Sequence, residues 1–213
     1  SIDIEARKRG NSSYFPDRVV PMLPDALSGN LCSLHEGVDR ACMSVCIKLN
    51  AEGTKLDHQF HRGIMRSPAS LSYEQAQGAF DGNYDNVTKP LAKALKDLLL
   101  AYKSASKARD KRQPLNLDLP ERKIVLSDDG EVLSVDFKNR FEAHKLVEEF
   151  MVMANVCAAE TLEANQETLL YRVHEEPTLE KLNALREVVE DSGLKLAKGQ
   201  VLKTHHLNKL LDT

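Results

Sequence analysis

Tryptophan is absent from the 213 residues, and aromatic side chains make up only 5% of them. The four cysteines form no C-x-x-C pair and have no histidine at zinc-finger spacing, so we expect reduced thiols rather than a disulfide or zinc scaffold. No apolar run reaches the length of about 18 residues that a membrane span needs, and the charged first residues are unlike a signal peptide. These absences predict a cytoplasmic protein that does not engage a membrane.

The sequence also lacks the familiar catalytic motifs. It contains no Walker loop, no G-x-S-x-G, no H-E-x-x-H, no G-x-G-x-x-G and no D-x-D cluster. Its only adjacent aspartates, Asp128 and Asp129, fall in the turn of a predicted hairpin, where turn geometry explains them. The motifs therefore assign no catalytic or metal-binding residue.

The net charge of -3 excludes the strong overall positive field of a small sequence-independent nucleic-acid binder. One stretch is locally basic, with Asp110 as its only acid; its cations are Lys103, Lys107, Arg109, Lys111 and Arg112. Taken alone, this stretch is better interpreted as the solvated end of a helix, whose C-terminal dipole favours cations.

Periodicity divides the chain into loops, hairpins and helices. Residues 1–42 are rich in Pro, Gly, Ser and Asn, which predicts a long irregular segment. Apolar and polar residues then alternate from Met43 to Leu49, which predicts a strand paired with a second strand over residues 56–64. A second hairpin is predicted over residues 123–135, with its turn at 127–130.

Helical spacing dominates the remainder. An apolar stripe at three- and four-residue steps predicts an amphipathic helix over residues 91–112. Segment 140–164 has almost no polar face, so its helix should lie at the centre of its domain, and its Cys157, like Cys42 and Cys46 of the first strand, should be a small core residue. Further helices are predicted over 178–191 and from Leu207 onward. Together these elements predict an α+β fold of mixed, largely antiparallel hairpins packed with long helices.

Glu148 and Asn155 stand seven residues apart in the apolar helix and so share one side of it. A carboxylate on a buried helix is costly unless it is paired or presented to a ligand. An ion pair with a basic side chain from another segment explains Glu148 at least as well as a functional role does. Glu149 lies nearer the stripe of Leu146, so the choice between the two acids rests on ideal helix geometry.

Eight segments carry a family resemblance, and they occur in the family's order. They are Arg7–Pro24 (RKRGNSSYFPDRVVPMLP), Leu31–Leu34, Gly37–Arg40, Ile64–Ser67, Leu71–Glu74 (LSYE), Leu117–Glu121 (LDLPE), Ala143–Asn155 (AHKLVEEFMVMAN) and Tyr171–His174 (YRVH). Together they resemble the interior of the catalytic domain of ribonuclease II/R-family (RNB) enzymes over nearly the whole chain. Within the family, the sequences of Tyr14–Pro16 (YFP) and Leu117–Glu121 (LDLPE) are more similar to the ribonuclease R branch than to ribonuclease II.

The resemblance implies a monomeric, processive 3'-to-5' exoribonuclease that hydrolyses single-stranded RNA to 5'-mononucleotides with Mg²⁺ or Mn²⁺ held by aspartates. By position, Tyr14 matches a family tyrosine that stacks on the terminal bases. Tyr73 and Glu148 match the pair that contacts sugars and favours ribose over deoxyribose. Leu117 stands where many relatives carry a phenylalanine that clamps the last base, so stacking there should be weaker.

Two segments of the family pattern are not found in this chain, since the aspartate loop belongs upstream of residue 1 and an arginine segment belongs downstream of Thr213. We therefore expect one incomplete RNB-type domain, with a loop-rich channel segment at 1–42, hairpins and a helix at 43–135, and a helical part at 136–213. We expect it to contain no catalytic residue, to hold no metal at a catalytic site, and to be inactive alone. The alternative is a non-catalytic RNA- or protein-binding module derived from an RNB domain.

Overall fold

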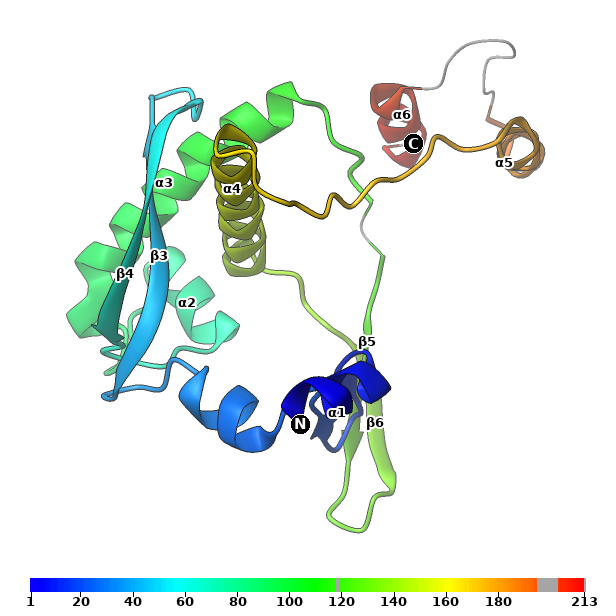
Figure 1. Cartoon of the computed structure of the whole chain (residues 1–213). Coiled ribbons are helices and arrows are strands. Elements are labelled where there is room, and N and C mark those ends of the chain that lie inside the picture. Colours follow the sequence, from blue (N-terminus) through cyan, green and yellow to red (C-terminus); the bar gives the residue numbers. More distant parts are fainter. Residues whose placement is uncertain (118, 195–202, 213) are drawn as a thin grey trace.

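The computed structural model describes residues 1–117, 119–194 and 203–212. The elements in these ranges are, in order, α1 (Ile2–Arg9), β1 (Ser13–Tyr14), β2 (Val19–Val20), η1 (Ala26–Leu31), β3 (Asp39–Leu49), β4 (Lys55–Arg66), α2 (Tyr73–Phe80), η2 (Lys89–Leu91), α3 (Ala92–Lys111), β5 (Arg122–Leu126), β6 (Val132–Phe137), α4 (Glu142–Ala164), α5 (Leu179–Asp191) and α6 (Thr204–Leu211). Figure 1 shows β3, β4, α2, α3 and α4 gathered in one part of the molecule, with α5 lying apart from them.

The strands pair as three separate antiparallel hairpins, β1 with β2, β3 with β4 and β5 with β6. The last two are the predicted hairpins, and the long predicted helices are α3 and α4. Of the alternating apolar residues from Met43 to Leu49, Val45, Ile47 and Leu49 are partly buried as predicted, whereas Met43 is 63% exposed. The predicted α+β class of antiparallel hairpins packed with long helices is confirmed.

The tip of the β3–β4 hairpin is fixed by local bonds and by contact with α3. Asn50 Oδ1 accepts hydrogen bonds from the backbone N–H groups of Glu52 (3.1 Å) and Thr54 (2.8 Å). Gly53 has a φ of 77° and is buried, and a Cβ added to it would lie 1.9 Å from the carbonyl oxygen of Ser104 in α3. Glycine is required here twice over, for its left-handed backbone and for the close approach.

The same hairpin is tied to α4 by polar side chains. Lys55 of β4 forms an ion pair with Glu160 of α4. His58 Nε2 lies 2.8 Å from the hydroxyl oxygen of Thr161 on the next position of that helix. The hairpin therefore contacts both long helices and fixes their relative position near the C-terminal half of each.

A small core lies where α2, α3 and α4 meet (Figure 1). Its buried apolar residues are Ala79 from α2, Leu95, Tyr102 and Ala105 from α3, and Ala143, Leu146 and Cys157 from α4. The residues from α3 belong to the predicted apolar stripe. The Tyr102 hydroxyl donates to a carboxylate oxygen of Glu142 at 3.3 Å, so the start of α4 is anchored on α3.

The prediction that α4 lies at the centre of its domain is wrong for the described structure. Val147, Met151, Val152 and Val156 are between 38% and 61% exposed, because α2 and α3 cover only part of the α4 surface. The accessible surface of the chain is 16630 Å². A closed globule of this length exposes roughly 9,900 Å². The chain therefore presents apolar surface that an enclosed domain would bury.

The cysteines divide between core and surface. Cys157 is buried, as predicted, whereas Cys42 is half-buried and Cys46 is exposed. The prediction of a core position is wrong for Cys46. Strand periodicity puts Cys46 on the face of β3 opposite Val45 and Ile47, and the described residues leave that face exposed from Ser44 to Lys48.

Helices α1 and α2 lie in segments where the sequence predicted none, while α5 and α6 confirm the predicted C-terminal helices. Gly193, just after α5, has a left-handed conformation with a φ of 79°, as is common where a helix ends. α6 is tied back to a segment far upstream through Asn208. Its side chain accepts from the N–H of Asn116 (2.9 Å) and donates to the carbonyl of Pro114 (2.9 Å).

We predict that Gly53→Ala destabilises the protein much more than Gly130→Ala, its counterpart in the β5–β6 turn. Both glycines have positive φ, but among the described residues an added Cβ at Gly130 meets nothing within 4 Å. Gly130→Ala should cost about 1–2 kcal/mol of unfolding free energy from backbone strain. Gly53→Ala should add about 1–3 kcal/mol from steric overlap with Ser104. Urea unfolding followed by circular dichroism measures both, and equal losses would contradict the tight contact with α3.

Candidate functional site

Helix α2 places Tyr73 at its first position. Ser72 Oγ accepts from the Gln75 N–H (3.2 Å) and Gln75 Oε1 accepts from the Ser72 N–H (3.0 Å), which forms a capping box. Gln75 also donates to a carboxylate oxygen of Asp85 (3.0 Å). Hydrogen bonds from the backbone and hydroxyl of Thr88, and then from Gln75, lower the pKa of Asp85 to about 2. These bonds fix where α2 begins and therefore where Tyr73 stands.

The first amides of α4 are satisfied by side chains. His144 Nδ1 accepts from the N–H of Phe141 at 3.1 Å. Because phenylalanine has no acceptor to offer in return, this bond is the reciprocal half of a capping box. Gln77 Oε1, from α2, accepts from the N–H of Ala143 at 3.3 Å. The start of α4 is thus bonded directly to α2.

An aromatic stack joins the starts of α2 and α4. The rings of Tyr73 and His144 lie with their centroids 3.8 Å apart and their planes 14° apart. The Phe141 ring lies 5.6 Å from the same histidine, with its plane tilted by 28°. Tyr73 is half-exposed, so one part of its surface stays open while the other rests on His144.

A cavity of about 570 Å³ lies beside this stack. Its lining comes from the loop after α3, the segment before α4, and the first two turns of α4; the residues are Leu117, Leu119, Pro120, Glu121, Lys138, Asn139, Arg140, His144 and Glu148. Lys138 donates to Glu121 at 2.9 Å, which lowers the pKa of that carboxyl and joins two of the lining segments. Leu117 and Glu148, two predicted RNA-contacting residues, therefore face one cavity, and Tyr73 is stacked on a third lining residue.

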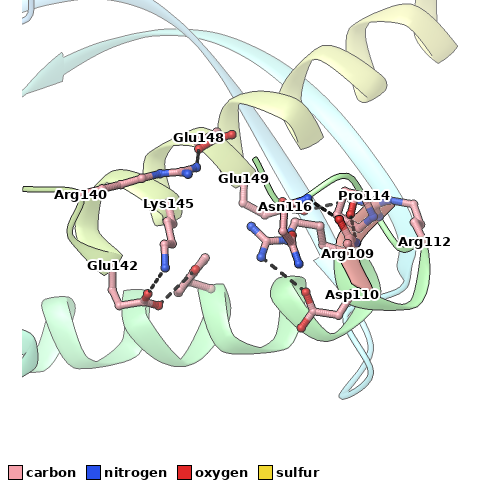
Figure 2. Close-up of polar contacts among 12 residues, drawn as sticks. Arg109, Asp110, Arg112, Pro114, Asn116, Arg140, Glu142, Lys145, Glu148 and Glu149 are labelled. Carbon is pink, nitrogen blue, oxygen red and sulfur yellow. Dashed lines mark hydrogen bonds and ion pairs between the residues drawn. The ribbon is translucent and has the colours of Figure 1, made fainter. Parts of the chain in front are cut away.

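Glu148 is exposed, which corrects the prediction of a carboxylate on a buried helix. Its side chain is 59% exposed and pairs with Arg140 Nη2 at 2.9 Å, whereas the side chain of Glu149 is 5% exposed and pairs with Arg112 Nη2 at 3.4 Å. Figure 2 shows Glu149 directed toward the C-terminal end of α3 and Glu148 directed away from it, toward Arg140. An exposed pair contributes little to stability. The ion pair therefore does not explain Glu148, and the structural carboxylate is Glu149.

Tyr14 lies elsewhere on the chain, in the short β1–β2 hairpin, and it does not line this cavity. Its side chain is 79% exposed, so Tyr14 does not fill the core. Its neighbour Phe15 is 50% exposed, and the guanidinium of Arg18 lies over the Phe15 ring at 5.3 Å from the centroid. The structure therefore does not bring Tyr14 together with Tyr73, Leu117 and Glu148.

Sequence reasoning missed His144 and Arg140 in this site. One signal was available for His144, because residues four apart on a helix share a face and His144 precedes Glu148 by four. The contact of His144 with Tyr73 could not be predicted in this way, because it joins two helices and helical periodicity does not show how helices pack against each other. Arg140 lies just before α4, outside the helix, so helical periodicity does not predict the direction of its side chain.

Within the described ranges, no group of three or more His, Cys, Asp or Glu side chains could hold a metal ion. The two acids of the cavity, Glu121 and Glu148, are each engaged by a cation, Lys138 and Arg140 respectively. The donors present here do not fit a divalent-metal centre, so no chemical step is assigned to one. Likewise, no described helix is both long and apolar enough to cross a membrane.

The family model of the RNB domain matches residues 1–213. The chain belongs to the RNB domain family. It is similar to Ribonuclease R of Escherichia coli (strain K12), with 35% identity over 214 residues that cover 100% of this chain and 26% of the relative. It is also similar to Ribonuclease R of Vibrio cholerae, with 36% identity over 201 residues that cover 93% of this chain and 24% of the relative. The chain thus spans about a quarter of the length of these relatives.

Solved structures agree with this assignment. The apo form of Mycoplasma genitalium RNase R superposes with a TM-score of 0.89 at 27% identity, over 100% of this chain and 34% of that one. The same RNase R in complex with ribose methylated single-stranded RNA gives the same TM-score and identity. The predicted resemblance to ribonuclease R is confirmed.

Proposed function

We propose that this chain is the RNA-holding interior of a 3'-to-5' exoribonuclease that degrades single-stranded RNA. The observation that carries the proposal is the shared cavity, in which Leu117 and Glu148 meet beside the stacked pair of Tyr73 and His144. Membership of the RNB domain family and the likeness to RNase R solved with RNA support it.

The cavity has the groups needed to hold an RNA end without reading its sequence. Leu117 offers an apolar face on which a base can pack, although without the π-face of an aromatic ring. Glu148 offers carboxylate oxygens that accept a hydrogen bond from a ribose 2'-hydroxyl, which DNA lacks. Because Arg140 pairs with Glu148 from one side, the carboxylate is oriented before the ligand arrives. Tyr73 completes the contact with the sugar.

Tyr14 supplies a separate stacking platform. Its exposed ring on a short hairpin can lie against a base, an interaction that tolerates any sequence. Hydrolysis itself we assign to Mg²⁺ or Mn²⁺ held by aspartates outside these residues, in one incomplete RNB-type catalytic domain of an intact monomeric enzyme. The four free cysteines fit an enzyme of the reducing cytoplasm.

A non-catalytic RNA-binding module is the second candidate function. Yeast Ssd1, described as a pseudonuclease, superposes with a TM-score of 0.65 at 18% identity, which shows that the fold also occurs without nuclease function. At that identity the likeness concerns the fold alone. The greater identity to proteins named Ribonuclease R favours the enzyme.

We predict that the 213-residue chain alone releases no mononucleotides from labelled single-stranded RNA in Mg²⁺ or Mn²⁺. Phosphodiester hydrolysis by two metals needs several convergent carboxylates, which the described residues do not supply. Denaturing gels of the reaction over time are the measurement, with an intact ribonuclease R as positive control. Metal-dependent release of mononucleotides by the pure chain would show that it contains a catalytic centre.

In the intact protein that contains this chain, we predict that Glu148→Ala lowers the preference for RNA over DNA about tenfold or more. A hydrogen bond to a charged group is worth about 1.5–3 kcal/mol, and only RNA has the 2'-hydroxyl that makes it. Tyr73→Ala should act in the same direction. The measurement is the ratio of kcat/KM for matched RNA and DNA oligonucleotides. Glu163→Ala, further along α4 and paired with Tyr171, is the control. Unchanged ratios in both test variants would remove the ribose contact.

For Tyr14, we predict that alanine weakens RNA binding of the intact protein by about 1–3 kcal/mol, the value of one base stacked on an aromatic ring. Thermal stability should hardly change, because the side chain is 79% exposed. Tyr14→Phe keeps the ring and should bind RNA as the wild type does. Titration of a fluorescent RNA in EDTA, together with a thermal melt, separates the two effects. A large loss of stability with unaltered RNA affinity would contradict the stacking role.

A further inference from the structure

The ring of His144 has a defined tautomer. The backbone N–H of Phe141 donates to Nδ1 at 3.1 Å, so Nδ1 carries the lone pair and not the proton. In the neutral ring the proton then resides on Nε2, which becomes a hydrogen-bond donor. Among the described residues, no hydrogen bond engages Nε2. The half-buried ring therefore brings to the lining of the cavity a donor that has no partner among the residues the structure describes.

The position of this ring is restrained on two sides. Tyr73 stacks on its face at 3.8 Å, and the bond from Phe141 holds its edge, so rotation about the side-chain bonds is limited. Glu148 follows one helical turn later on the same face of α4 and lines the same cavity. A fixed donor and a fixed acceptor therefore lie one turn apart along one wall.

A ribose 2'-hydroxyl both donates one hydrogen bond and accepts another. A site that supplies only a carboxylate accepts the hydrogen bond from this hydroxyl but offers no donor to its oxygen. We propose that His144 is a specificity-determining residue, whose Nε2–H donates to the oxygen of the same 2'-hydroxyl whose proton is donated to Glu148. This assignment rests on the proposed function, since it names a further contact within that RNA site. The hydroxyl is then bonded in both directions, and deoxyribose leaves both protein groups without a partner.

Two substitutions separate the donor from the other roles of the ring. His144→Glu removes the ring and every side-chain donor but keeps an acceptor for the Phe141 amide, the contact that Gln75 makes at the same position of α2. His144→Phe keeps an aromatic ring against Tyr73 but removes both nitrogens. The two variants share the loss of the Nε2–H and differ in everything else.

The test uses the intact protein in EDTA, with RNA and DNA oligonucleotides of one sequence and length as probes. Both variants should lower the ratio of RNA to DNA affinity by about two- to tenfold, the range of one neutral hydrogen bond. His144→Phe should leave DNA affinity within about twofold, whereas the added charge of His144→Glu should weaken RNA and DNA binding alike and so leave the ratio as the readout. His206→Glu changes the histidine at the equivalent position of α6, which does not line this cavity, and should leave the ratio unchanged.

Each outcome separates one explanation. A reduced ratio in both variants supports the donor. A reduced ratio in His144→Glu alone shows that the ring acts through Tyr73, and a reduced ratio in His144→Phe alone shows that only the cap of α4 matters. Either result overturns the proposal, as does an unchanged ratio in both variants. If Glu148→Ala and Tyr73→Ala also leave the ratio unchanged, the RNA site itself fails. If they lower it while the His144 variants do not, only the inference about His144 fails.

Discussion

The geometry of the site depends on how the first backbone amides of α4 find acceptors. A helix leaves its first N–H groups without partners inside the helix, and burying them without acceptors is costly. Here Phe141 donates to His144 within α4, and Ala143 donates to Gln77 of α2. The second bond fixes the start of one helix against the side of another. The stack of Tyr73 on His144, and the direction in which Glu148 leaves the helix, both follow from that placement.

Adjacent glutamates on α4 are used for different purposes. About 100° of helical rotation separates Glu148 from Glu149, and this is enough to put one carboxylate at the cavity and the other between the helices. Glu149 is almost fully buried, so removing its partner Arg112 would leave an uncompensated charge. That pair also gives Arg112, one cation of the basic stretch at the end of α3, a structural role. Glu148, paired at the surface with Arg140, remains accessible to a ligand.

Sequence periodicity predicted the two long helices and the two longer hairpins because each has many residues on one repeating pattern. It missed α1 and α2, which are eight residues each and depend on caps such as Ser72 with Gln75 rather than on a long apolar stripe. It also misjudged the surroundings of Glu148, since a pattern shows which faces are apolar and not which faces are covered. Leu117 and Glu148 were placed by family resemblance, whereas the partners His144 and Arg140 required the tertiary structure.

The hydrogen bonds of Asn208 have a consequence for the order in which a ribosome completes this region. Pro114 and Asn116 lead directly into Leu117 and the cavity wall, yet their side-chain partner is translated 94 residues after Pro114. By then the residues of α3, β5, β6 and α4 have all been synthesised. A nascent chain can therefore assemble the stack of Tyr73 and His144 well before this part of the wall is anchored. The anchoring belongs to a late, non-local step of folding, of the kind that is intrinsically slow.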